Sequence, residues 1–170
     1  MFRISQYMEE IAHPTPLGEK RNPPGPVVIW NLIRRCNLTC KHCYSISADK
    51  DFPGELATAE IYGVMDDLKR FRVPVLILSG GEPLLRPDIF DIARRAKGMG
   101  FYVGLSSNGT LIDESNIRRI EETDFNYVGV SLDGIRETHD KFRRMQGAFE
   151  KSLAGIRLCR DAGLKIGVRF

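Results

Sequence analysis

Five short apolar stretches recur along the chain, and each has the length of one β-strand. We predict strands over residues 27–33, 73–78, 101–105, 127–132 and 166–170. Their apolar runs are continuous rather than alternating, so both faces of each strand are expected to be buried, as in a parallel sheet.

Between these stretches, apolar residues recur every three or four positions and predict helices. Thr58 is the expected N-cap of the first helix. Pro87 is expected in the first turn of the second, and a short third helix is expected after Asp113. The apolar faces of the four helices are Ile61, Val64, Leu68 and Phe71; Ile89, Ile92 and Ala96; Ile117 and Ile120; and Phe149, Leu153, Ile156 and Cys159.

Alternating strands and helices predict an α/β fold with parallel pairing and right-handed crossovers. An open doubly wound sheet and part of a (β/α) barrel both satisfy this pattern. In either architecture ligands bind at the C-terminal ends of the strands. Residues 1–26, rich in proline and glycine after residue 13, are expected to form an irregular arm, and residues 27–170 the folded core.

The composition is that of an ordinary globular domain of 170 residues, with 42% apolar and 28% charged residues. A net charge of +3 does not indicate a nucleic-acid partner. We find no signal peptide and no run near the roughly 20 apolar residues of a membrane span, so neither secretion nor a membrane is expected. Three of the four cysteines lie within eight residues, which in a reducing cytoplasm favours metal ligands over disulfides.

Cys36, Cys40 and Cys43 follow the first strand with the spacing C-x3-C-x2-C. Three thiolates this close can hold three corners of an iron–sulfur cubane, leaving one iron open to a substrate. Their place at a strand end favours a catalytic site over a remote structural one.

Zinc is the alternative, because structural zinc sites take four protein ligands. His42, His139 or Cys159 could complete such a site. Cys159, however, lies on the apolar face of a predicted helix, where a buried and inert thiol is the simpler expectation.

The other strand ends carry further polar groups. The second ends in Ser79-Gly80-Gly81-Glu82-Pro83, where glycines allow close approach of a ligand and the carboxylate suits an ammonium group. Read alone, this segment is also consistent with a tight turn. The third and fourth strands end in residues 106–110 (SSNGT) and 131–134 (SLDG), whose short side chains can bond a ribose or a carboxylate or merely form turns.

Together, the cysteine spacing and Gly-Gly-Glu-Pro resemble the paired signature of radical S-adenosylmethionine (SAM) enzymes. The resemblance implies a partial (β/α) barrel, with Cys36, Cys40 and Cys43 binding a [4Fe–4S] cluster. An electron from the cluster would break the sulfonium C–S bond of SAM, and the resulting 5′-deoxyadenosyl radical would abstract a substrate hydrogen. The implied SAM contacts are the His42 backbone at the adenine, Gly80, Gly81, Glu82 and Pro83 around the methionine amino group, and Ser107, Asn108, Ser131 and Asp133 at the ribose and carboxylate.

Three weaker expectations accompany these contacts. Arg169 on the fifth strand could reach a SAM carboxylate. His139-Asp140 and Arg143 resemble an H-D-x-x-R stretch of relatives with auxiliary clusters, although a solvated loop with a local ion pair is an equal alternative. Basic residues near the cluster could attract a polyanionic substrate or simply be solvated: Arg34, Arg35 and Lys41.

Within the superfamily, the segments ISQYMEE, PPGPVVIWNLIRRCNLTCKHCYS and SGGEPLLRPDIF are most similar to the enzymes of heme d1 biosynthesis. That resemblance implies radical removal of propionate side chains from didecarboxysiroheme, an iron tetrapyrrole, with an electron donor such as a flavodoxin or ferredoxin. Enzymes of alternative heme biosynthesis and of peptide maturation share most of the motifs. A non-catalytic metal-binding module, or a carrier of a cluster or tetrapyrrole, is the alternative of a different class.

The resemblance to these relatives implies a six-stranded partial barrel followed by a cysteine-rich extension. This chain ends in the fifth strand, so we expect an N-terminal half that lacks much of the substrate site. Its fifth strand would form an unprotected edge, and such edges recruit other chains. Dimers, swapped oligomers or aggregates are therefore expected.

Overall fold

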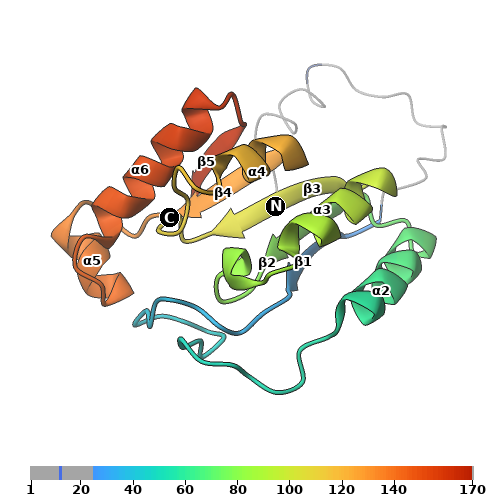
Figure 1. The fold of residues 1–170 in the computed structure, drawn as a ribbon, viewed down its shortest axis with the longest axis horizontal. Coiled ribbons are helices and arrows are strands. Elements are labelled where there is room, and N and C mark those ends of the chain that lie inside the picture. Colours follow the sequence, from blue (N-terminus) through green and yellow to red (C-terminus); the bar gives the residue numbers. More distant parts are fainter. Residues whose placement is uncertain (1–11, 13–24, 170) are drawn as a thin grey trace.

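A five-stranded sheet runs through the centre of the structure, a computed structural model that describes residue 12 and residues 25–169 (Figure 1). All neighbouring strands pair in parallel, in the order β1-β2-β3-β4-β5. The strands are β1 (Val27–Asn31), β2 (Val75–Ser79), β3 (Tyr102–Ser107), β4 (Tyr127–Ser131) and β5 (Ile166–Arg169). All five predicted strands are confirmed. The predicted arm, apart from residues 12, 25 and 26, and residue 170 lie outside the described residues.

The helices form a layer over one face of the sheet (Figure 1). They are α2 (Thr58–Arg70), the 3-10 helix η1 (Pro83–Leu85), α3 (Ile89–Gly98), α4 (Ile117–Thr123), α5 (Glu137–Arg143) and α6 (Ala148–Asp161). In this layer α3 contacts both α2 and α4, and α6 contacts α4. Among the described helices, none is long and apolar enough to cross a lipid bilayer.

The strand order separates the two architectures that the sequence left open. A doubly wound sheet reverses its order at a switch point and carries helices on both faces. Here each strand pairs with the next one in the chain, and the helical layer covers one face. This is the winding of a (β/α) barrel, so the fold is part of a barrel.

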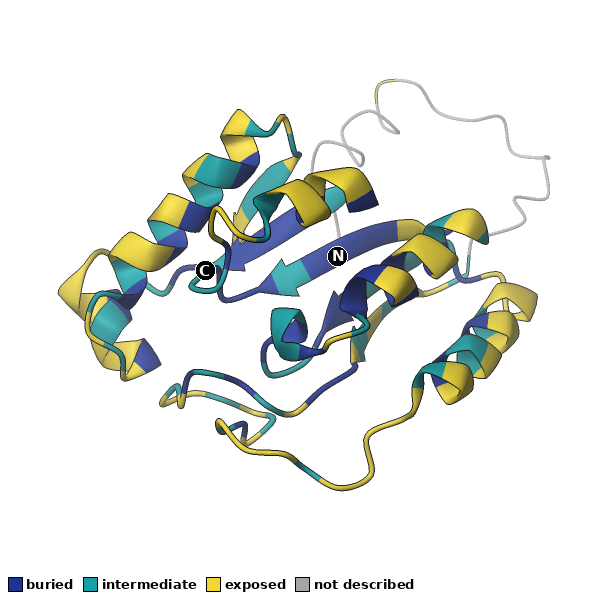
Figure 2. Ribbon diagram, in the orientation of Figure 1, coloured by how far each residue is buried: buried dark blue, intermediate teal, exposed yellow. Residues whose placement is uncertain are grey.

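Alternate residues of the strands face the helices and form the core. They are Leu76 and Leu78 of β2, Val103 and Leu105 of β3, and Val128 and Val130 of β4, all buried together with the inner faces of the helices (Figure 2). The residues between them face the other side of the sheet, which no described helix covers. Polar residues therefore reach this open face near the C-terminal end of each strand.

The first strand is less buried than predicted. Val27 is 57% and Ile29 62% exposed, because β1 is an edge strand and both residues lie on the uncovered face. The expectation that both faces of every strand are buried is therefore wrong for β1, where Val28 and Trp30 alone pack against the core. It is also wrong for β5, none of whose residues is buried.

The start and end of α2 also differ from the prediction. Ala57, not Thr58, is the N-cap, and its backbone N–H donates to the Glu60 carboxylate at 2.7 Å. Phe71 is the C-cap and is 70% exposed, whereas Met65, absent from the predicted face, is fully buried. Likewise, Pro87 precedes α3, which begins at Ile89 after the N-cap Asp88.

The buried face of α6 differs from the predicted one. Ala148, Ser152, Gly155 and Cys159 are the buried residues, and only Cys159 belongs to both sets. A Cβ on Gly155 would lie 2.6 Å from the carbonyl oxygen of Gly109. Small residues thus let α6 approach the loop that follows β3, so close packing rather than side-chain size decides this face.

Candidate functional site

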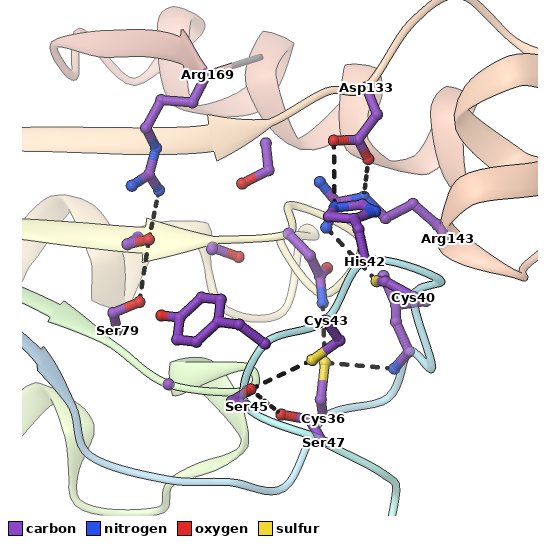
Figure 3. Close-up of a pocket in the computed structure, with 18 of the residues that line it drawn as sticks. Cys36, Cys40, His42, Cys43, Ser45, Ser47, Ser79, Asp133, Arg143 and Arg169 are labelled. Carbon is purple, nitrogen blue, oxygen red and sulfur yellow. Dashed lines mark hydrogen bonds and ion pairs between the residues drawn. The ribbon is translucent and has the colours of Figure 1, made fainter.

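A cavity of about 390 Å³ opens at the C-terminal ends of the strands (Figure 3). The segment after β1, here called the cysteine loop (residues 32–57), forms one wall, and the ends of β2 to β5 form the other. The lining includes Cys36, Cys40, His42, Cys43, Ser79, Gly80, Gly81, Ser106, Ser107, Asn108, Ser131, Asp133, Arg143 and Arg169. All predicted site residues except Glu82 and Pro83 are among them.

The cysteine loop is held to the sheet by backbone hydrogen bonds at its beginning. Leu32 N donates to Ser79 O at 3.0 Å, and Cys36 N donates to Ala48 O at 3.1 Å, which turns the loop back on itself. Between these anchors the chain forms turns rather than a helix or strand. A loop of this shape can present three neighbouring cysteines to one space.

Each of the three thiols receives a different hydrogen bond. Cys36 Sγ accepts from Leu38 N at 3.4 Å and from Asn108 Nδ2 at 3.8 Å. Cys43 Sγ and the Ser45 hydroxyl are 3.3 Å apart. Arg143 Nη1 donates to Cys40 Sγ at 3.6 Å. Hydrogen bonds to sulfur help to orient side chains that hold a metal or a cluster.

Burial and hydrogen bonding shift the pKa values of two of these thiols in opposite directions. Burial raises the pKa of Cys36 to about 11. Burial also acts to raise the pKa of Cys43, but hydrogen bonds from Ser45 and Ser47 outweigh it and bring the pKa to about 7. Cys159 is fully buried on α6, with a pKa raised by burial to about 11, which agrees with the inert thiol predicted for it.

The three cysteines of the cavity have the chemistry that an iron–sulfur cluster requires. Cys36, Cys40 and Cys43 are free thiols that line the same cavity, and thiolates are the ligands of such clusters. Within the described ranges, no three His, Cys, Asp or Glu side chains are placed to hold a metal ion directly. Three cysteines on one wall of the cavity are thus a suitable ligand set for an iron–sulfur cluster.

The Gly80-Gly81 turn packs against the entrance of the cysteine loop. Gly80 has a φ of +152°, and a Cβ on Gly81 would lie 2.4 Å from Arg35 O and 2.5 Å from Arg34 O. Gly81 N also donates to Ile33 O at 2.6 Å. Both glycines line the cavity. On their other side, the space that a side chain would need is occupied by the backbone of residues 33–35.

Glu82 faces the loop after β3 rather than the cavity. Its fully buried carboxylate accepts hydrogen bonds from Ser107 Oγ at 3.0 and 3.1 Å, Asn108 N at 2.8 Å and Leu84 N at 3.1 Å. Burial raises its pKa to about 7, against the lowering effect of these bonds. Glu82 therefore ties the second strand end to the third. Its predicted contact with a methionine amino group stays a prediction.

Asn108, at the end of β3, is hydrogen-bonded both to the cysteine loop and to α6. Its Nδ2 donates to Asn37 Oδ1 at 2.9 Å as well as to Cys36, and its carbonyl accepts from Ser152 Oγ at 2.8 Å. Thr110 Oγ1 accepts from Asn37 Nδ2 at 2.8 Å. These bonds fix the cysteine loop against α6 through the end of β3.

At the ends of β4 and β5 the cavity wall carries charges of both signs. Asp133 lies 2.6 Å from Arg143 Nε and 3.5 Å from His42 Nε2. Arg169 donates to the Ser106 hydroxyl and, at 3.1 Å, to Gly129 O. Ser79 Oγ in turn donates to Ser106 Oγ at 3.3 Å, as the sticks in Figure 3 illustrate.

The H-D-x-x-R stretch is not the solvated loop that was one of its two interpretations. Residues Glu137–Arg143 form α5, in which His139 is fully buried and Arg143 is 8% exposed. Burial and the nearby Arg143 cation lower the pKa of His139. Only the ion pair of that interpretation is present, and it joins Arg143 to Asp133 across the cavity wall.

The basic residues of the cysteine loop do not line the cavity. Arg35 pairs with Asp49 at 2.8 Å, and Arg34 lies over the Phe52 ring at 4.3 Å. Lys41 is exposed. Their expected attraction for an anionic substrate stays a prediction.

Several lining residues were missed by the sequence analysis. A period of two in the first strand identifies Ile29, because its neighbours Val28 and Trp30 pack against the core. Ser45 and Ser47 had a weaker signal, their position two and four residues after the third cysteine.

The chain resembles known proteins over nearly its whole length. A sequence model described as "Radical SAM superfamily" matches residues 30–170. The chain is 54% identical to the pre-heme d1 synthase of Dinoroseobacter shibae over 170 residues, 100% of this chain and 42% of the relative. It is 50% identical to the Fe-coproporphyrin III synthase of Methanosarcina barkeri over 145 residues, 85% of this chain and 36% of the relative.

The fold has solved counterparts as well. The structure of anSMEcpe with bound AdoMet and the Cp18Cys peptide has a TM-score of 0.66 at 25% identity, covering 86% of this chain and 42% of that one. The chain therefore spans less than half the length of each of these relatives.

Proposed function

Because the chain belongs to the radical SAM superfamily, we propose that it forms the cofactor-binding part of an enzyme of the pre-heme d1 synthase type. The proposed cofactors are a [4Fe–4S] cluster and SAM. The observation that carries the proposal is one cavity at the strand ends, lined by three free cysteines on one side and by the Gly80-Gly81 turn and the end of β3 on the other.

Cys36, Cys40 and Cys43 are the proposed cluster ligands. Bound there, the cluster would supply the electron that breaks the sulfonium C–S bond of SAM and starts radical chemistry on a substrate. The protein's own contribution is to orient the ligands and to exclude water. Asn108 contributes to both, since it bonds Cys36 and closes the wall between the cysteine loop and α6.

The proposed SAM site occupies the remaining cavity wall. Gly80 and Gly81 offer backbone groups to the methionine amino group, with Glu82 and Pro83 supporting the turn from behind. The His42 backbone is the proposed adenine contact. The remaining proposed contacts, for the ribose and the carboxylate, are Ser107, Asn108, Ser131 and Asp133. Arg169 is a further candidate for the carboxylate, because its guanidinium lines the cavity and no carboxylate pairs with it among the described residues.

The proposed substrate is an iron tetrapyrrole of the didecarboxysiroheme type, from which propionate side chains are removed. The supporting observation is that two relatives at 50% identity or above carry the names of synthases of heme-type tetrapyrroles. An electron donor such as a flavodoxin or ferredoxin and a cytoplasmic location belong to the same proposal.

Reductive cleavage of SAM is the direct test. The chain is reconstituted with iron and sulfide under anaerobic conditions and mixed with dithionite and SAM, and 5′-deoxyadenosine is measured by chromatography. We expect formation of 5′-deoxyadenosine by the reconstituted chain and none by Cys36→Ala. The matched control is Cys159→Ala, which removes a thiol outside the cavity and should retain cleavage.

A chain that binds four irons and SAM without forming 5′-deoxyadenosine would instead be a carrier. A chain that takes up zinc but shows no visible absorption after reconstitution would be a metal-binding module. Either result overturns the enzymatic proposal. The substrate is tested separately, by adding didecarboxysiroheme and following loss of its propionates by mass spectrometry.

A further inference from the structure

The short helix α5 is fixed to both of its neighbours by partly buried hydrogen bonds. Asp133 N, just after β4, donates to His139 Nδ1 at 3.1 Å. The Asp140 carboxylate accepts from Gly147 N at 2.6 Å and from Phe149 N at 2.8 Å, at the start of α6. Because these bonds join α5 to the end of β4 and the start of α6, the helix has a defined position beside the cavity.

From this position α5 contacts the middle of the cysteine loop. Lys41 N donates to Phe142 O, in the last turn of the helix, at 2.8 Å. The ring of Phe142 lies 5.7 Å from that of His42, centroid to centroid. The segment between the second and third cysteines therefore rests on the end of α5.

Arg143, the last residue of α5, directs its positive charge at the second cysteine. Its Nε lies 2.6 Å from Asp133 Oδ2, and its Nη1 donates to Cys40 Sγ at 3.6 Å (Figure 3). Asp133 is itself placed by the turn that bonds His139. Arg143 as a whole is 8% exposed, so water screens its charge little.

The other two cysteines receive neutral donors. Cys36 accepts from a backbone N–H and the Asn108 amide, and Cys43 pairs with the Ser45 hydroxyl. Among the described residues, only Arg143 brings a cation to one of these sulfurs by a hydrogen bond. Charge-assisted hydrogen bonds are roughly twice as strong as neutral ones, so Cys40 is distinguished from its neighbours.

We propose that Arg143 is a positioning residue that orients Cys40 and raises the reduction potential of the group bound by the three cysteines. Reduction adds one electron, supplied by a reductant such as dithionite, with no bond broken and no proton moved. The added negative charge is stabilised by a nearby cation and by a hydrogen bond to a ligand sulfur. The inference rests on the proposed function, because it assumes a redox cluster at this site.

The test compares reconstituted variants at a fixed potential, by electron paramagnetic resonance of the reduced cluster. Arg143→Gln should lower the ratio of reduced to oxidised cluster about tenfold, which corresponds to about 59 mV for one electron. Arg143→Lys keeps the charge but is too short to contact both Asp133 and Cys40, so about a threefold loss is expected. Arg157→Gln, which removes an exposed arginine from α6, is the matched control and should leave the ratio unchanged.

Iron content and circular dichroism are measured for every variant. If Arg143→Gln carries full iron and the wild-type ratio, the proposal is wrong. If that variant does not fold, Arg143→Lys decides, since a wild-type ratio overturns the proposal and a lowered ratio supports it. A wild-type chain that binds no cluster would instead overturn the proposed function, and this inference with it.

Discussion

The position of a Cβ on Gly81 lies 2.4 Å from the carbonyl oxygen of Arg35, at the entrance of the cysteine loop. Real Cβ atoms do not approach a backbone oxygen so closely. The absence of a side chain at residue 81 is thus required by the protein's own backbone, whatever ligand the turn binds.

Substitution of Gly81 should therefore affect the cysteine loop as well as any ligand. From sequence alone, a β-branched residue here is expected to weaken SAM binding and spare the cluster. From the contact with Arg35, we expect Gly81→Val to lower both iron uptake and SAM affinity, and to destabilise the fold by about 1–3 kcal/mol. Iron analysis, calorimetry and urea unfolding measure the three effects. Gly63→Ala, in open space on α2, is the control and should stabilise by up to about 1 kcal/mol.

Iron stoichiometry should depend on three cysteines and not on the fourth. Anaerobic reconstitution is expected to give about four irons per chain in the wild type, as a [4Fe–4S] cluster requires. Alanine at Cys36, Cys40 or Cys43 should abolish this uptake. Cys159→Ala should retain it, because that thiol belongs to the buried face of α6 and lies in the core. Full iron content after loss of any of the three cavity cysteines would disprove the ligand assignment.

The buried Glu82 carboxyl should make stability depend on pH. Its pKa is raised from 4.5 to about 7, so the fold favours the protonated form. This contribution to stability is fully present below about pH 4.5 and is lost as the pH rises through 7. Relative to Glu82→Gln, the wild type should lose on the order of 3 kcal/mol between pH 4 and pH 8.

The measurement for Glu82 is urea unfolding of the metal-free chain at several pH values. Glu114→Gln, at an exposed position, controls for the loss of one carboxylate. Parallel pH profiles for the wild type and Glu82→Gln would show that the carboxyl is not perturbed by burial.

Arg169 should contribute to SAM affinity. Its guanidinium lines the cavity without a carboxylate partner among the described residues, and charged hydrogen bonds contribute about 1.5–3 kcal/mol. Arg169→Gln is therefore expected to weaken SAM binding about tenfold or more in calorimetry, with iron content unchanged. Arg160→Gln, at an exposed position of α6, should bind like the wild type. If Arg169→Gln bound SAM as tightly as Arg160→Gln and the wild type, a contact between Arg169 and SAM would be excluded.

The outer edge of β5 should promote association of a 170-residue chain. Among the described strands β5 pairs with β4 alone, and Val168 is 41% exposed. Unpaired strand edges recruit other chains, and an edge lysine opposes this. Light scattering over a concentration series should show dimers or larger species for the wild type and fewer for Val168→Lys. A monodisperse wild-type monomer at high concentration would refute the expectation.

The sequence predicted the strands and most of the cavity because both depend on local patterns. Apolar runs located all five strands, and the rule that ligands bind at strand ends brought Cys36, Gly80 and Asn108 to one cavity. The missed features depend on contacts between distant segments. Arg143 belongs to the H-D-x-x-R stretch, but its hydrogen bond to Cys40, a residue 103 positions away, follows only from the fold.

Burial was predicted less well than secondary structure. Phe71 is exposed because α2 ends one residue before it, and Ile29 because no helix covers its face of the sheet. On α6, Gly155 and Ser152 are buried in place of larger residues, since the loop after β3 lies close to the helix. Hydrophobicity alone cannot indicate how closely two backbones approach.

The order of the strands also bears on how the sheet can assemble. Each strand pairs with the one before it in the chain, so the sheet can grow in the direction of synthesis without waiting for distant segments. The cysteine loop is different, because Cys40 and Arg143 are separated by 103 residues and their contact closes the longest loop at the cavity. Closing such a loop carries a larger entropic cost than pairing neighbouring strands. The cavity wall formed by Arg143 is therefore absent until α5 is in place, and a cofactor that arrives earlier meets a cysteine loop without this contact.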